Sequence, residues 1–306
     1  MRNAKRLRPI SAVSIAGSDS GGGAGIQADL LTFAAHGVYG ATVVTAGTAQ
    51  NTRGVVSVEP FTAGFVGEQL DAVFSDLAPA AVKIGMLCDA PHVRAVAEGL
   101  ARHGARNVVL DPVFFSTSGA VLLSPAGVRA LRSDLLPLCD VVTPNLQEAA
   151  ILARREVRTA SEQQDAACRL VELGARAALV KGGHAPGDRI RDVLRDGEGM
   201  RVFENRRVTT RATHGTGCML SAAIAANLAL GFGMEEAVRR AIRYLRAALR
   251  RGVFPGAGMG IPGLPARFRP RSRIGSRPPS KPSRRSRSGG RRGRRHGPGH
   301  DSSRPP

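Results

Sequence analysis

A cysteine behind a glycine turn is the first feature of this sequence that suggests chemistry. The segment reads His214-Gly215-Thr216-Gly217-Cys218 and leads into small, apolar residues up to Leu230, which predict a helix. The first N–H groups of a helix favour an anion, such as a phosphoryl group that gains charge during transfer. A thiol in the first helical turn can have a lowered pKa and act as a base. The alternative is a buried structural cysteine, and the segment alone leaves both open.

A second glycine-rich segment lies near the start of the chain. Residues 17–25 read GSDSGGGAG, between a predicted strand and a predicted helix. Glycines at such a place let the backbone approach a ligand closely. A flexible turn without a ligand is the alternative. The spacing matches neither G-x-x-x-x-G-K-S/T nor G-x-G-x-x-G, so the sequence disfavours a P-loop and a Rossmann dinucleotide site.

Polar residues also follow three of the predicted strands. Asp111, Asn145 and Lys181 each come after a short apolar run, and Glu148 lies one helical turn after Asn145. Ligands of open α/β sheets bind outside the carboxyl ends of the strands. Lys181 is suited to neutralise nucleotide phosphate, while Asn145 and Glu148 offer oxygen ligands to Mg²⁺, directly or through water. Each residue alone is more often a helix cap or a solvated loop residue, but the group together favours a site.

The elements that must position these residues follow an α/β pattern. Short β-like runs alternate with helical patterns along most of the chain, which predicts βαβ units and a largely parallel sheet. Several runs are apolar almost throughout, as expected for strands that helices cover on both faces. The predicted strands are 12–16, 41–46, 80–84, 107–111, 140–143 and 177–180.

Helices are predicted between these strands and near the end of the domain. The segments 24–36 and 90–103 each stop at a glycine, which is typical of a helix end. From Val238 to Leu249, apolar residues recur every three or four positions and arginines occupy the other faces. This pattern predicts an amphipathic helix that closes the domain.

Charge separates the body of the chain from its last part. Residues 263–306 hold thirteen Arg and one Lys against one Asp, a charge of +13, which leaves +7 of the total +20 for residues 1–262. A mildly basic body suits a protein that handles phosphates and does not by itself indicate a nucleic-acid surface. The last segment is rich in Arg, Pro, Ser and Gly and lacks apolar periodicity, so we expect it to be disordered.

We therefore expect a basic N-terminal extension over residues 1–9, one α/β domain over residues 10–262 and a disordered tail over residues 263–306. The tail suggests a fused extension or the product of a reading-frame shift. Basic residues before the first strand imitate a signal peptide, but the apolar run is short and leads into the glycine loop. The four cysteines lack the spacing of a disulfide framework or a zinc site. Because no apolar run is long enough for a membrane span, we expect a cytoplasmic protein.

Taken in order, six segments resemble the signature of the hydroxymethylpyrimidine/phosphomethylpyrimidine kinases of thiamine biosynthesis. The resemblance covers about residues 10–251. It implies a ribokinase-like fold, which is a three-layer α/β/α sandwich with a mostly parallel central sheet. The segments are 16–29 (AGSDSGGGAGIQAD), 48–52 (TAQNT), 83–86 (KIGM), 143–149 (TPNLQEA), 181–184 (KGGH) and 214–218 (HGTGC).

The resemblance also implies roles for single residues around a pyrimidine. Gln50 would hydrogen-bond the aminopyrimidine substrate, and Gly17, Asp29 and Met86 would line the same pocket. Cys218 would act as the base, at a position where many ribokinase-like sugar kinases have an aspartate. The backbone amides of Gly215, Thr216 and Gly217 would form the anion hole beside it.

For the nucleotide, the resemblance implies ATP with Mg²⁺. Lys181, Asn145, Glu148 and Asp111 would bind them, with the metal ion held by Glu148 and Asn145 through water. The implied reaction is in-line attack of the substrate hydroxymethyl oxygen on the γ-phosphoryl group of ATP, followed by a second transfer that gives the diphosphate.

Two other functions stay open from the sequence. A pyridoxal-type vitamin B6 kinase is the first alternative, because related enzymes share the fold and some share the cysteine. A nucleic-acid-binding protein is the more distant one. The tail lacks interleaved aromatic residues, so we expect at most weak, salt-sensitive binding to polyanions and no specific nucleic acid. The oligomeric state is undecided, and a homodimer is one of the open expectations.

Overall fold

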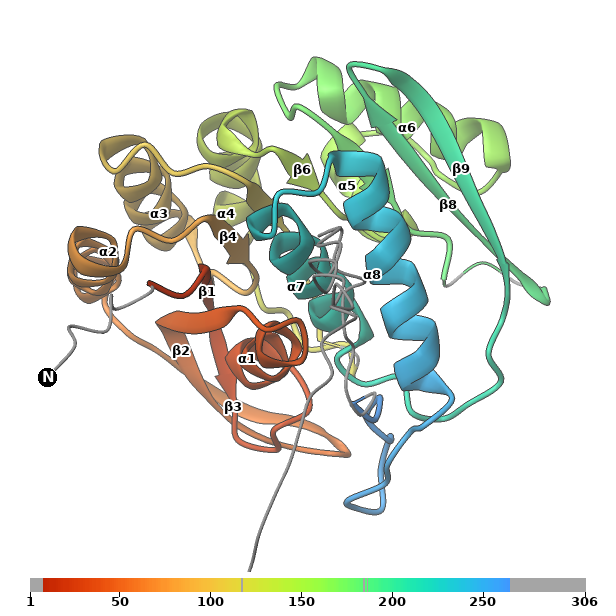
Figure 1. Ribbon diagram of the computed structural model, residues 1–306, viewed down its shortest axis with the longest axis horizontal. Coiled ribbons are helices and arrows are strands. Elements are labelled where there is room, and N and C mark those ends of the chain that lie inside the picture. Colours follow the sequence, from red (N-terminus) through yellow and green to blue (C-terminus); the bar gives the residue numbers. More distant parts are fainter. Residues whose placement is uncertain (1–7, 117, 184, 186, 265–306) are drawn as a thin grey trace, which may run out of the picture. The chain divides into compact units, whose positions relative to one another are not determined.

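The computed structural model describes residues 8–116, 118–183, 185 and 187–264. The strands in this part of the chain are β1 (Ser11–Asp19), β2 (Tyr39–Asn51), β3 (Gly54–Pro60), β4 (Ala81–Ile84), β5 (Val108–Leu110), β6 (Val141–Val142), β7 (Ala178–Val180), β8 (Arg189–Asp196) and β9 (Gly199–Arg206). They form one sheet in the order β3-β2-β1-β4-β5-β6-β7-β8-β9 (Figure 1). The six strands from β2 to β7 in this order are parallel, and β3, β8 and β9 are antiparallel to their neighbours.

All six strands predicted from the sequence are present, and they are the parallel ones. Most of their apolar residues are buried because helices cover both faces of the sheet. The sequence did not reveal the three antiparallel strands at the two ends of the sheet. In β9, residues alternate between half-buried and exposed, so the strand has fewer apolar residues to mark it.

Helices form a layer on each face of the sheet (Figure 1). On one face, α1, α7 and α8 pack together over one apolar cluster; on the other, α2 to α6 pack over a second cluster. This arrangement confirms the predicted three-layer α/β/α sandwich. The helices are α1 (Gly25–Ala35), α2 (Ala63–Leu77), α3 (Ala90–Arg102), α4 (Pro125–Ala130), α5 (Leu146–Ala153), α6 (Ala160–Glu172), α7 (Thr216–Ala229) and α8 (Met234–Leu249), with a short π-helix at Leu131–Leu135 and a 3-10 turn at Leu136–Leu138.

The predicted helix ends agree closely with the structure. Helices α1 and α3 end just before Gly37 and Gly104, whose φ angles are 73° and 58°. A residue with a Cβ is disfavoured in this left-handed region, so glycine stops the helix there. None of the helices in the described ranges is long and apolar enough to cross a membrane.

After α8, the chain folds back onto the domain. Val253 and Ile261 form a β-bridge, and the N–H of Met259 donates to the carbonyl of Thr52 at 2.8 Å. Gly263 is buried, and its N–H donates to the carbonyl of Ala248. The domain therefore extends at least to Gly263, one residue beyond the predicted boundary. The rest of the predicted tail from residue 265, and residues 1–7 of the N-terminal extension, lie outside the described residues.

Candidate active site

A cavity of about 880 Å³ opens at the carboxyl ends of the parallel strands. Ligands of open α/β sheets bind at this edge. Residues at or after the ends of β1, β4, β5, β6 and β7 line the cavity, together with the first turn of α7 and one side of α8. Of the twelve residues predicted for the site, eleven line it: Gly17, Gln50, Met86, Asp111, Asn145, Glu148, Lys181, Gly215, Thr216, Gly217 and Cys218.

Asp29 is the exception, and the prediction that it lines the pocket is wrong. Its side chain is completely buried and accepts from the Nζ of Lys83 at 2.7 Å and from the Oγ of Ser14 at 2.5 Å. Lys83, not Asp29, is among the residues of the cavity wall. Asp29 therefore lies behind the wall and holds the lysine in place.

Lys83 was missed as a site residue, although a signal for it exists in the sequence. It is the one charged residue of β4, whose four residues are all buried. Burial by itself would lower the pKa of Lys83, but the attraction of Asp29, with further contributions from Cys218 and Asp111, raises it. The ammonium is therefore charged, and a charged residue within an apolar strand indicates a buried partner.

A second ion pair lies at the ends of the neighbouring strands. The Nζ of Lys181 lies 2.9 Å from Asp111 Oδ1, and both side chains are largely buried. They lie directly against the glycine turn, because a Cβ on Gly217 would be 3.3 Å from Asp111 Oδ2 and 3.5 Å from Lys181 Nζ. The turn and the ion pair thus form one continuous surface of backbone N–H groups and charge.

Asn145 and Glu148 form a reciprocal cap at the start of α5. The Oδ1 of Asn145 accepts from the N–H of Glu148 at 2.9 Å, and Glu148 Oε2 accepts from the N–H of Asn145 at 2.8 Å. Each side chain is therefore partly engaged by the helix. Burial raises the pKa of Glu148 to about 7; Lys181 opposes this and Asp111 adds to it.

Asp192 on β8 adds a further carboxylate near Lys181. It accepts from the N–H of Gly182 at 2.9 Å, and burial raises its pKa to about 6 against the opposing effects of Gly182 and Lys181. The sequence could not point to this residue, because β8 was not predicted. Three carboxylates thus lie near one lysine at this end of the cavity.

Cys218 lies in the first turn of α7, as predicted, and is half-buried at the cavity wall. The residue before the helix, Gly215, has φ 78°. The expectation of a lowered thiol pKa is not met in this structure. Burial raises the pKa of Cys218 to about 11, although Lys83 and the N–H of Gly25 act in the opposite direction. Desolvation of a thiolate outweighs the helix terminus here.

At the other end of the cavity, Asp19 and His214 join the two glycine segments. The Nε2 of His214 lies 3.0 Å from Asp19 Oδ2, and the side-chain amide of Gln50 is 3.3 Å from the same Nε2. Asp19 also accepts from the N–H groups of Gly21, Gly23 and Ala24. Both residues belong to the quoted motifs, but the sequence alone gave neither of them a role.

One wall of the cavity is apolar and comes partly from α8. Ile242, Leu245 and Leu249 line it together with Leu220 and Val208. The prediction that this face of the last helix only closes the domain is therefore incomplete. Val238 packs in the core as expected, while the following turns of the same face line the cavity and offer it a surface for a flat ring.

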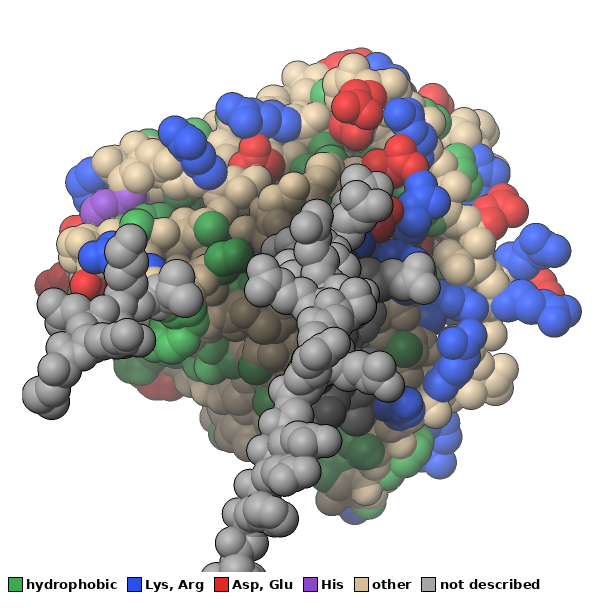
Figure 2. All heavy atoms as spheres, in the orientation of Figure 1, with side chains coloured by type: hydrophobic (Ala, Val, Ile, Leu, Met, Phe, Trp, Pro, Cys, Tyr) green, Lys and Arg blue, Asp and Glu red, His purple; other side chains and the backbone are tan. Residues whose placement is uncertain are grey.

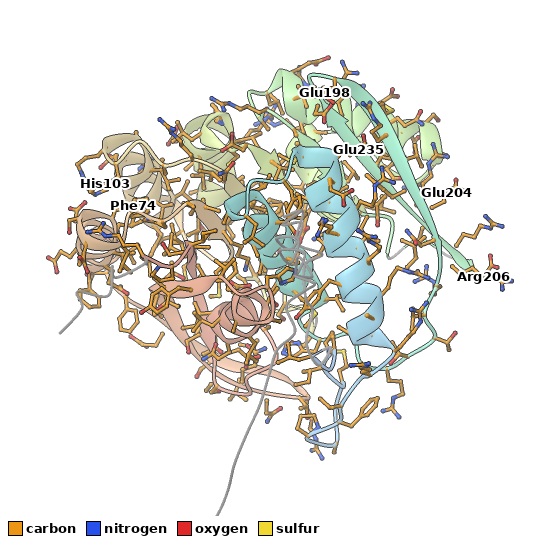
Figure 3. The ribbon with its side chains drawn as sticks, viewed as in Figure 1. Phe74, His103, Glu198, Glu204, Arg206 and Glu235 are labelled. Carbon is orange, nitrogen blue, oxygen red and sulfur yellow. The ribbon has the colours of Figure 1, made fainter. Side chains whose placement is uncertain are left out.

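A second hollow of about 630 Å³ lies at the opposite end of the sheet, beside the residues that precede or begin β5, β6 and β7. Glu198 and Glu235 line it (Figure 3). Arg201 approaches both carboxylates, at 3.7 Å and 3.0 Å. Because these charges are already paired, this hollow does not call for a ligand. No group of three or more metal-binding side chains is found in the part of the chain that the structure describes.

The fold and the cavity together define the class of protein: a phosphotransferase with the ribokinase-like fold. Two solved kinase structures are similar to it. An ADP complex of Bacillus subtilis pyridoxal kinase has a TM-score of 0.79 at 36% identity and covers 84% of this chain and 97% of its own. A phosphomethylpyrimidine kinase from Clostridium difficile has a TM-score of 0.70 at 39% identity and covers 78% of this chain and 98% of its own.

Sequence comparison gives the family. A family model described as phosphomethylpyrimidine kinase matches residues 19–262. A hydroxymethylpyrimidine/phosphomethylpyrimidine kinase of Rhizobium meliloti is 55% identical over 239 residues, which are 78% of this chain and 90% of the relative. The chain belongs to the phosphomethylpyrimidine kinase family.

Proposed function

We propose that this protein uses ATP to phosphorylate 4-amino-5-hydroxymethyl-2-methylpyrimidine to its monophosphate, and then the monophosphate to the diphosphate, in thiamine biosynthesis. The observation that carries the proposal is that the two ends of one cavity differ in the residues that line them. Gln50 and Met86 belong to the end suited to a small aromatic ring, and Lys181 and Asp111 to the end suited to phosphate. Cys218 lines the same cavity directly after Gly217, which lies against Asp111 and Lys181.

The phosphate end fits Mg²⁺ together with ATP. Asp111, Glu148 and Asp192 surround a single lysine there, and the ion prefers carboxylate oxygens while it keeps several waters. Glu148, with Asn145 through water, would hold it. When bound, Mg²⁺ would neutralise charge on the phosphate oxygens. The apolar wall formed by Leu220, Ile242 and Leu245 would receive the adenine ring.

In the proposed reaction, the chain positions the substrates and stabilises charge. The backbone N–H groups from Gly215 to Gly217 face the phosphoryl group as its negative charge grows. Cys218 takes the proton of the substrate hydroxyl as the oxygen attacks the phosphorus, and the bond to ADP breaks on the opposite side. Lys83 favours the thiolate that Cys218 needs, and Lys181 neutralises phosphate.

The direct test is a product analysis. The purified protein is incubated with ATP, Mg²⁺ and hydroxymethylpyrimidine, and the mono- and diphosphate are identified by mass. Both products are expected. Appearance of the monophosphate alone would limit the proposal to the first transfer, and the absence of any phosphorylated pyrimidine would refute it.

Pyridoxal is the second candidate substrate. The likeness to the Bacillus subtilis pyridoxal kinase, at a TM-score of 0.79, supports it, since the two chains share the cavity-forming fold. Relative kcat/KM values for hydroxymethylpyrimidine and pyridoxal separate the two, because they measure discrimination directly. We expect the pyrimidine to be preferred, in line with the family of the chain.

A further inference from the structure

Three side chains from separate parts of the chain meet at the pyrimidine end of the cavity. Asp19 ends β1, Gln50 lies near the end of β2, and His214 comes just before the glycine turn. His214 Nε2 is 3.0 Å from Asp19 Oδ2 and 3.3 Å from the nitrogen of the Gln50 amide. The oxygen of that amide is 3.1 Å from the hydroxyl of Thr48.

The protonation state of the pair follows from the surroundings of Asp19. Burial opposes its charge, but the hydrogen bonds from His214 and from the N–H groups of Gly21 and Ala24 outweigh burial and lower the pKa of Asp19. An ionised carboxylate only accepts hydrogen bonds. The Nε2 of His214 must therefore carry a hydrogen, whether the ring is neutral or charged.

This hydrogen determines which end of the Gln50 amide faces the histidine. An N–H on His214 and an NH₂ on Gln50 would both be donors at the same contact. Thr48 donates its hydroxyl hydrogen to the carbonyl of Ser18 at 3.0 Å, so its oxygen can accept. The balance of donors and acceptors therefore favours the amide oxygen toward His214 and the amide nitrogen toward Thr48.

The direction of this amide has a consequence for the substrate. An aminopyrimidine edge presents one ring-nitrogen acceptor next to one amino donor, and it pairs with an amide in one direction only. The hydroxymethyl group is attached beside the amino group, so a reversed pairing would turn it to the other side of the ring. The amide direction thus decides whether the reacting hydroxyl reaches Cys218.

We propose that His214, held by Asp19, is a positioning residue that fixes the direction of the Gln50 amide and thereby the recognition of the aminopyrimidine edge. The packing supports a fixed position. A Cβ on Gly23 would lie 2.5 Å from His214 Cδ2, so the ring is packed closely against this glycine. The backbone N–H of His214 donates to the carbonyl of Gly260. The proposal rests on the proposed pyrimidine kinase function.

The test compares two substitutions of similar size. In His214→Gln the side-chain NH₂ can take the place of Nε2–H. In His214→Asn the side chain is too short for its NH₂ to reach that position. With hydroxymethylpyrimidine, we expect His214→Asn to raise KM about 5- to 10-fold, and His214→Gln to stay close to the wild type. The KM for ATP should change less than about twofold in both.

A double-mutant cycle with Gln50→Leu separates positioning from a general structural role. Gln50→Leu should raise KM for the pyrimidine strongly and leave ATP binding nearly intact. If His214 acts through Gln50, adding His214→Asn to Gln50→Leu should not raise the KM for the pyrimidine further, since the amide is already gone.

A second readout is a substrate analogue with oxygen in place of the amino group. His214→Asn should reduce the ratio of kcat/KM values by which the amino compound is preferred over this analogue.

The outcomes distinguish this inference from the proposed function. If the wild type does not phosphorylate the pyrimidine, the proposed function fails and the inference fails with it. If the wild type is active but the effects of His214→Asn and Gln50→Leu are additive, only the inference is overturned. Equal loss in His214→Asn and His214→Gln, with ATP affected as well, would also overturn it.

Discussion

Two buried lysines reach the same cavity, and the comparison between them separates its two ends. Lys83 is completely buried against one carboxylate, Asp29, so the pair is balanced without any ligand. Lys181 is 14% exposed and faces Asp111, with Glu148 and Asp192 nearby. One end of the cavity thus pairs its lysine with a single carboxylate, whereas the other gathers three carboxylates near Lys181, with Arg207 also in the cavity wall.

The difference indicates different tasks. An isolated buried ion pair contributes little to stability compared with a well-packed apolar pair, because both charges lose their hydration. In the proposed mechanism Lys83 has a further task, because its charge lowers the pKa of the Cys218 thiol against the effect of burial. In the proposed complex, Mg²⁺ would lie between these carboxylates and the phosphate oxygens, and the metal–nucleotide complex as a whole would remain an anion. Lys and Arg side chains gather on the side of the molecule that carries α8 and the β8–β9 hairpin (Figure 2), where they would attract such an anion.

The largest expected loss of turnover follows a change at Cys218, which lines the cavity in the first turn of α7. Cys218→Ala should fold normally and reduce kcat by about 10²- to 10⁴-fold, the usual contribution of a general base. Cys168→Ala, a change on α6, is the matched control and should keep wild-type turnover. Unchanged turnover in pure Cys218→Ala would remove the thiol from the mechanism and leave it as a structural cysteine.

The pH dependence sharpens this assignment. Burial raises the pKa of Cys218 to about 11, so the thiolate fraction rises about tenfold per pH unit well below that value. Because the pH dependence of kcat/KM reports the ionisation of groups in the free enzyme, kcat/KM should increase between about pH 7 and 9. A profile that is flat over this interval would contradict a thiol base with a raised pKa.

The next largest effects on stability and turnover are expected from changes to the ion pair of Lys83 and Asp29. Lys83→Met leaves Asp29 buried without its partner and should lower the free energy of unfolding by about 3–5 kcal/mol. The double change Lys83→Met/Asp29→Leu should recover most of this loss while kcat stays low, because the thiolate has lost its cation. Denaturant unfolding and turnover are measured on the same preparations. Full recovery of turnover in the double variant would reduce the pair to a structural role.

At the end of the cavity that contains Lys181, the change Glu148→Gln tests the proposed binding of Mg²⁺ and should have a smaller effect. The glutamine can still accept from the N–H of Asn145, so α5 keeps its cap. The Mg²⁺ concentration for half-maximal rate should rise about tenfold, with KM for the pyrimidine unchanged. Glu162→Gln is the control, since Glu162 caps α6 with Thr159 in the same way on the protein surface. Equal effects of the two changes would show that only helix capping was lost.

The smallest effect is expected from removal of the residues after Leu264. Truncation after Leu264 should leave the melting temperature and the kinase activity nearly unchanged, because the last buried contact of the described chain is made by Gly263. It should abolish salt-sensitive binding to polyanions, which filter binding measures. A truncated protein that is insoluble or inactive would place residues beyond 264 in the fold.

Much of the fold could be predicted because its signals are local. The parallel strands are apolar runs, and glycines mark the ends of α1 and α3. The antiparallel strands at the sheet ends were missed because partly exposed strands carry mixed residues, as in β9. With β8 unpredicted, Asp192 had no predicted strand to place it in the site.

The sequence by itself pointed to residues that the structure gathers in one cavity: Cys218 behind its glycine turn, Lys181 and Asp111 after their strands, and Gln50 in its motif. It could do so because residue type, spacing and strand ends are properties of short segments. Only the tertiary structure decided that Asp29 serves Lys83 and that burial raises the pKa of Cys218. Partners and desolvation depend on residues far apart in the chain, and no local pattern records them.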